Sequence, residues 1–154
     1  VKSYSEISLI KRKVALSVHR QFRSKFLDKL KLADATFDYL SFTPGELKQH
    51  LESQFEPWMS WENWGKYTTK KWQDSNQNTW VWNLDHIIPV GAFDFSVSEG
   101  EEFSICWSLE NLRPLSAKYN IKDKKRLNFV KNLTGDGLDW TEIRAEVLKC
   151  RLTD

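Results

Sequence analysis

Apolar residues recur every four positions near the start of the chain, at Val14, Val18, Phe22 and Phe26. In an α-helix this spacing places the four side chains on one face, where they can pack against a core. Neither proline nor glycine occurs within residues 7–31. We therefore predict a helix or a pair of helices there, with the basic residues of the segment on the remaining face.

The next helix is predicted from its first turn. Thr43 is a preferred N-cap residue, Pro44 suits the first helical position, and Glu46 three residues after the cap completes a capping box. Pro57 cannot continue the helix, so the helix ends before it. Residues 139–142 repeat the capping pattern and predict a closing helix near the end of the chain.

The middle of the chain lacks a helical period. Residues 57–80 combine Trp with Gly, Asn and Ser, which is typical of a loop held by ring packing. Residues 80–88 are apolar and rich in β-favouring types, so we predict a buried strand. Residues 103–108 fit either a return strand or a helical turn. Pro114 favours the first turn of a helix that carries Asn120.

The composition is that of one folded domain of 154 residues, 40% of them hydrophobic and 29% charged. Cys106 and Cys150 are too far apart for a zinc knuckle, and they argue against a disulfide-stapled secreted fold. No apolar run reaches membrane-spanning length, and no signal peptide is recognisable. We expect a cytoplasmic or otherwise intracellular protein without a membrane partner.

The net charge is only +2, but its distribution is uneven. Basic residues concentrate in residues 2–31 and again in residues 118–131. Such clusters suit a phosphate-binding surface, and they equally suit a solvated helix face. The eight Trp and nine Phe residues predict a ring-rich core, with stacking on bases or sugars as the alternative for one or two of them.

Candidate chemistry concentrates in residues 82–124. His86 suits a general base, because an imidazole with an ordinary pKa near ~6.5 is largely neutral at physiological pH. Asp85 and the amide oxygen of Asn120 are hard donors of the kind that Mg²⁺ prefers. Asn111 can both donate and accept hydrogen bonds, so it suits bracing of the loop after His86. Adjacent residues of a regular strand face opposite ways, so Asp85 and His86 share a site only if the strand ends, bends or twists there.

The order Asp-His-Ile-Ile-Pro from Asp85, Asn-Leu-x-Pro-Leu from Asn111, and Asn120 nine residues later resembles the HNH endonucleases of the ββα-metal class. It is most similar to the small phage-type members that lack zinc-binding cysteines. The resemblance covers about residues 43–125. It departs from a common family pattern in residues 121–124, where relatives often carry a Lys-Gly pair and this chain has Ile-Lys-Asp-Lys. The role of the aspartate in that segment stays open.

This resemblance implies an α+β fold with a ββα-metal core and additional N-terminal and C-terminal helices. Residues 1–56 would form a helical segment that contacts DNA, residues 57–131 the nuclease core, and residues 132–154 a helix packed on the core. The implied activity is metal-dependent hydrolysis of phosphodiester bonds in double-stranded DNA, by a phage- or virus-encoded enzyme with a homing, packaging or restriction role. The oligomeric state, monomer or homodimer, stays open. A non-catalytic DNA-binding module on a decayed HNH scaffold is the alternative, and a carbohydrate-binding domain is a third interpretation.

At the matching positions, the family implies that Asp85 and Asn120 hold one Mg²⁺ or Mn²⁺, that His86 is the general base, and that Asn111 braces the hairpin loop. No structural zinc is expected. Lys124 is expected to share a helix face with Asn120. The basic residues that we expect to contact DNA are Arg12, Lys13, Arg20, Arg23, Arg113, Lys122, Lys124 and Lys125.

Overall fold

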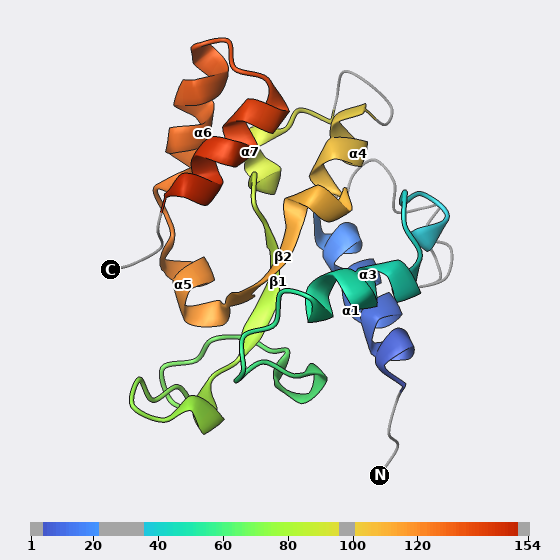
Figure 1. Cartoon of the computed structure of the whole chain (residues 1–154), viewed down its shortest axis with the longest axis vertical. Coiled ribbons are helices and arrows are strands. Elements are labelled where there is room, and N and C mark those ends of the chain that lie inside the picture. The colour runs from blue at the N-terminus through green and yellow to red at the C-terminus, as the bar shows by residue number, and fades with distance from the viewer. Residues whose placement is uncertain (1–4, 22–35, 96–100, 151–154) are drawn as a thin grey trace.

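A computed structural model describes residues 5–21, 36–95 and 101–150 of the chain. Helices surround one small antiparallel sheet, which confirms the predicted mixture of α and β structure (Figure 1). The helices are α1 (Glu6–Gln21), α3 (Pro44–Glu52), α4 (Glu101–Cys106), α5 (Ala117–Lys122), α6 (Arg126–Gly135) and α7 (Trp140–Lys149), and the strands are β1 (Trp82–His86) and β2 (Leu112–Ser116). Among the described helices, none is both long and apolar enough to cross a membrane.

The sheet pairs β1 with β2 in antiparallel register, with Asp85 opposite Arg113 and Leu84 opposite Pro114. The predicted strand at residues 80–88 is confirmed by β1. The prediction that Pro114 begins a helix is wrong, because Pro114 lies inside β2. Both strands of a two-stranded sheet are edge strands, so a proline that cannot donate to the ladder is tolerated there. Most of residues 103–108, which the sequence left undecided, belongs to α4.

Apolar side chains from α1, α3 and β1 form the centre of the core. Val14 and Val18 are buried on α1, as their spacing predicted, and Leu47 and Leu51 are buried on α3. The predicted positions Phe22 and Phe26 lie outside the described residues. Trp82 of β1 is fully buried among other rings, with Phe55, Trp61 and Trp64 all within ring-contact distance. The Trp-rich segment therefore packs on the strand that carries Asp85 and His86.

The capping boxes predicted for two helices are present. At α3 the backbone N–H of Glu46 donates to Thr43 Oγ1 at 3.1 Å, and the N–H of Thr43 donates to the Glu46 carboxylate at 3.0 Å. Asp139 and Glu142 make the same exchange at α7. These local hydrogen bonds satisfy backbone donors that the first turn of a helix leaves without partners. The first-turn patterns were therefore sufficient to locate both helix starts.

A break between α5 and α6 was not predicted. Asp123 has a ψ of 75°, which is not helical, and it ends α5 directly after Lys122. Lys124 therefore lies in the turn, and the expectation that it shares a helix face with Asn120 is wrong. The side chain of Asp123 accepts a hydrogen bond from Arg126 Nε at 2.6 Å, which closes the turn. A new helix starts at Arg126, and the domain boundary predicted after residue 131 falls inside it.

Candidate functional site

Asp85 is a buried carboxylate, 3% exposed, with two guanidinium groups beside it. Arg113, its partner across the sheet, donates from Nε to Asp85 Oδ2 at 2.8 Å. Arg126 of α6 donates from Nη1 to both carboxylate oxygens at 2.9 Å. A buried charge is stable only when it is paired and hydrogen-bonded, and here both oxygens are engaged. The negative charge of Asp85 is therefore balanced by protein groups.

Arg126 connects Asp85 to the segment that follows β1. Its Nη1 also donates to the carbonyl oxygen of His86 at 3.0 Å, and its Nε donates to Asp123. Burial by itself would lower the pKa of Arg126, but the charge of Asp85 and the hydrogen bond to Asp123 outweigh it, so that the pKa is raised. The guanidinium stays charged at any pH at which the protein is folded.

His86 is the last residue of β1, and its imidazole is buried. The ring lies edge-on against Trp107, with 4.5 Å between the ring centroids. Burial, followed by the positive charge of Arg126, lowers the pKa of His86 to about 3. The imidazole is therefore neutral at physiological pH, as a proton acceptor must be. Among the described residues, none forms a hydrogen bond with its Nε2 atom, which is buried.

Asn111 holds the segment after His86 in place. Its Oδ1 accepts from the Ile88 N–H at 2.9 Å, and its Nδ2 donates to the carbonyls of Ile88 and Cys106 at 3.2 and 3.0 Å. The Ile87 N–H donates to the Asn111 carbonyl at 2.8 Å. The side chain is fully buried and ties the segment after β1 to the end of α4. These contacts are those that a bracing residue needs.

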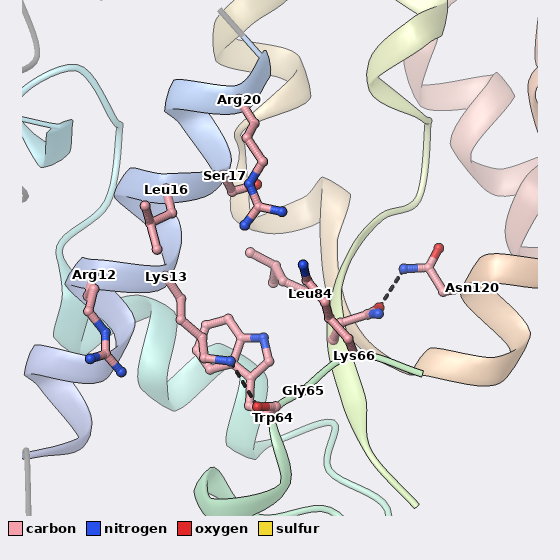
Figure 2. Close-up of a pocket in the computed structure, with 11 residues that line it drawn as sticks. Arg12, Lys13, Leu16, Ser17, Arg20, Trp64, Gly65, Lys66, Leu84 and Asn120 are labelled. Carbon is pink, nitrogen blue, oxygen red and sulfur yellow. Dashed lines mark hydrogen bonds between the residues drawn. The ribbon is translucent and has the colours of Figure 1, made fainter. Parts of the chain in front are cut away.

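Asn120 lies on α5, the helix that directly follows β2. Its amide nitrogen donates to Asn83 Oδ1 on β1, and Figure 2 labels Asn120 beside a hollow between α1 and β1. Asp85, His86 and Asn120 all line one pocket of about 210 Å³, together with Asp123 and Arg126. We call this space the Asp85 pocket. It brings together three residues that the sequence predicted would share a site.

The Asp85 pocket contains oxygen donors but no cluster of acidic, His or Cys ligands. Among the described residues, no three His, Cys, Asp or Glu side chains are grouped to hold a metal. The oxygen donors that line the pocket are the carboxylates of Asp85 and Asp123 and the amide of Asn120. Hard oxygens of this kind suit Mg²⁺, which is commonly bound by one or two carboxylates with waters and phosphates as further ligands.

The basic residues predicted to contact DNA are distributed over several places. Arg12, Lys13 and Arg20 line a larger hollow between α1 and β1 (Figure 2). Arg113 lies in the ion pair with Asp85. The side chains of Lys122, Lys124 and Lys125 are exposed around the turn between α5 and α6. Arg23 lies outside the described residues.

Three residues that line this region were not selected in the sequence analysis. Arg126 was included there only as one member of a basic cluster. Arg126 and Val130 are four positions apart and both are buried on α6, so this spacing was a signal that Arg126 faces the interior. Lys66 and Asn83 line the hollow between α1 and β1. Nothing in the pattern around Lys66 or Asn83 distinguished them from other loop or strand residues.

No family model matches the chain, and no solved structure matches it. The chain is similar to an uncharacterized protein of Acanthamoeba polyphaga mimivirus, with 38% identity over 91 residues. The match covers 58% of this chain and 33% of the viral protein, so it spans about a third of the relative's length.

Proposed function

We propose that the protein is a metal-dependent endonuclease of the HNH type that hydrolyses phosphodiester bonds of double-stranded DNA, with His86 as the general base. The observation that carries the proposal is the meeting of Asp85, His86 and Asn120 in one pocket. The order of elements supports it, because two antiparallel strands are followed directly by α5, which packs against both. The two strands and α5 form a ββα arrangement. The pocket residues supply a carboxylate, an imidazole and an amide, which are residue types suited to phosphodiester hydrolysis.

In this proposal His86 takes a proton from the attacking water. Its neutral imidazole has the correct protonation state, and its buried Nε2 has acceptor capacity that no described residue uses. Asn111 keeps the segment after His86 in a single position, through its hydrogen bonds to Ile88. Trp107 restricts rotation of the imidazole by packing against it, with the two rings nearly perpendicular. The base is thus oriented before substrate arrives.

The metal would be Mg²⁺ or Mn²⁺, held by Asp85 and the amide oxygen of Asn120. When bound, the ion would neutralise charge on the phosphate and the leaving oxygen. Arg126 and Arg113 share the carboxylate oxygens of Asp85, so these guanidinium groups set how strongly Asp85 attracts a cation. The donor types fit, and Asp123 is a further carboxylate on the pocket wall.

The test is plasmid nicking. Supercoiled plasmid is incubated with the protein in Mg²⁺ or in EDTA, and the products are separated on a gel. We expect nicking in Mg²⁺ that is lost in EDTA and in His86→Ala. His50→Gln is a matched control, because His50 lies on α3 and its imidazole contacts the Leu112 carbonyl rather than the pocket. Nicking by His86→Ala at the wild-type rate would refute the assignment of the base.

A non-catalytic DNA-binding module is the second candidate. One observation favours it, because Asp85 is already neutralised by two arginines and needs no metal for charge balance. In that case the same gel would show retarded plasmid without nicking, in Mg²⁺ and in EDTA alike. The setting we propose for either function is a virus-encoded protein inside a host cell, with which a mimivirus relative is consistent.

A further inference from the structure

The hollow between α1 and β1 is a groove with basic side chains on both sides. Its volume is about 600 Å³, and Arg12, Lys13, Arg20 and Lys66 line it. Figure 2 shows Lys13 and Arg20 extending from α1, with Trp64 and Lys66 facing them. We call this space the basic groove. Three of its cations come from α1 and one from a loop distant in sequence, so the tertiary structure assembles the groove.

The basic groove concentrates positive charge. Among the described residues that line it, none is Asp or Glu. The pKa of Lys13 is lowered, first by partial burial and then by the charges of Arg12, Arg20 and Lys66. A pKa lowered by like charges means that these cations repel one another. The chain as a whole carries only +2, so this charge is a local feature that favours an anionic ligand.

The floor of the basic groove is held firmly against the sheet. Lys13 Nζ donates to the Trp64 carbonyl at 2.8 Å and lies 4.9 Å from the centroid of the Trp64 ring. That ring stacks on Trp82 with 4.7 Å between centroids. The Gly65 N–H donates to the Trp82 carbonyl at 2.9 Å. The groove therefore exists before any ligand binds, which lowers the entropic cost of binding.

The basic groove continues into the Asp85 pocket. Leu84 and Asn120 line both spaces. Asn83 lines the groove and accepts the hydrogen bond from Asn120. An extended anionic chain lying along the groove would pass the Asn83–Asn120 pair and reach the pocket that holds Asp85 and His86. A polymer with regularly spaced phosphates could contact Arg20 and Lys66 in the groove and still reach the Asp85 pocket, whereas a small anion occupies only part of this path.

We propose that the basic groove binds the sugar–phosphate backbone of one DNA strand beside the bond that is cut, with Arg20 and Lys66 contacting phosphates. The position of the groove beside a cleaved bond rests on the proposed nuclease function, whereas DNA binding by the groove does not depend on that function. A concave groove fits a single strand of a duplex, whereas a lipid bilayer presents a flat surface that α1 and β1 together cannot follow. Contacts of this kind position the substrate without reading its sequence.

The test measures affinity for a fluorescein-labelled DNA duplex by anisotropy in EDTA, over a series of salt concentrations. We expect Arg20→Gln and Lys66→Gln each to lower the slope of log affinity against log salt by about 1, because each removes one phosphate contact. Lys149→Gln is the matched control, since Lys149 is an exposed lysine on α7 that pairs with Glu146. It should keep the wild-type slope. Circular dichroism melting confirms that each variant is folded.

Wild-type slopes in both folded variants would overturn the proposal, and so would loss of DNA binding with retained binding to phosphatidylserine vesicles. Single-turnover cleavage in Mg²⁺ separates the two proposals. At saturating protein, Lys149→Gln should keep both the wild-type slope and the wild-type cleavage rate, whereas His86→Ala should bind DNA with the wild-type slope and not cut. If the wild type never cuts but the groove variants still lower the slope, the groove proposal stands and the nuclease proposal fails.

Discussion

The Asp85 pocket and the basic groove lie side by side, with Leu84 and Asn120 in the wall of both. In the pocket, the carboxylates of Asp85 and Asp123 face the guanidinium groups of Arg113 and Arg126, and each charge has a partner within 3 Å. In the groove, four cations gather with no carboxylate among the described lining residues. The pocket therefore holds paired charges of both signs, whereas the described lining of the groove carries charges of one sign only.

This difference follows from burial. Removing an ion from water costs several kcal/mol unless a counter-charge is close, so the buried Asp85 requires its arginines for the fold to be stable. Arg12, Arg20 and Lys66 of the groove are exposed and keep their hydration, so they tolerate one another at a small cost. The paired charges of the pocket therefore contribute to the stability of the fold, whereas the charges of the groove contribute little to it.

The largest expected effect on stability is in the pocket. Arg126→Gln removes a guanidinium that donates to Asp85, Asp123 and the His86 carbonyl. We expect it to lower the free energy of unfolding by about 3 kcal/mol, the usual cost of breaking a buried ion pair on one side. Urea denaturation at pH 7 measures the change. Lys125→Gln, its exposed neighbour, should stay within about 0.5 kcal/mol of wild type. Equal stability of the two variants would show that the pocket does not depend on charge balance.

A smaller loss of stability is expected when the pH is lowered, because His86 is buried in its neutral form. The pKa of His86 is about 3 when folded and near its ordinary value of 6.5 when unfolded, so between these values only the unfolded chain binds the proton. The stability contribution is therefore complete above pH 6.5 and falls as pH is lowered, by about 1.4 kcal/mol per pH unit. From pH 6.5 to pH 5 the loss is about 2 kcal/mol by the same relation. Urea denaturation of wild type and His86→Gln at both pH values isolates this contribution, and parallel curves for the two would contradict it.

The smallest expected change in stability is in the basic groove, where a substitution should stabilise the protein slightly or leave its stability unchanged. Arg20→Gln removes one of the charges that lower the pKa of Lys13. We expect the variant to be as stable as wild type or up to about 0.5 kcal/mol more stable, because relief of repulsion at an exposed site is small. Thermal denaturation at low salt measures it, and the gain should shrink as salt screens the charges. A clear loss of stability would show that Arg20 stabilises the fold, and would count against its assignment as a phosphate contact.

Local patterns were sufficient to locate several elements of the fold. The capping boxes at Thr43 and Asp139 located two helix starts, and the apolar run around Leu84 located β1. Asp85, His86 and Asn120 were chosen from residue type and spacing, and the structure places them around one pocket. The capping and strand signals succeed because a cap or a strand is determined by residues close together in the sequence.

The same patterns failed where a distant residue decided the outcome. Pro114 looked like a helix start, but pairing with β1 placed it in a strand. His86 was expected to have an ordinary pKa, but packing against Trp107 and the nearby charge of Arg126 lower it. Each case depends on a contact between residues well separated in the chain, which local periodicity does not encode.

The sequence by itself determined which chemical groups are available around β1 and β2: a carboxylate next to an imidazole, and two asparagines nine positions apart. Only the tertiary structure decided the electrostatics around those groups. It brought Arg126 to Asp85 from 41 positions away and set Lys66 opposite Arg20. Charge interactions act through space and depend on burial, so neither the balance in the pocket nor the excess in the groove could be read from the order of residues.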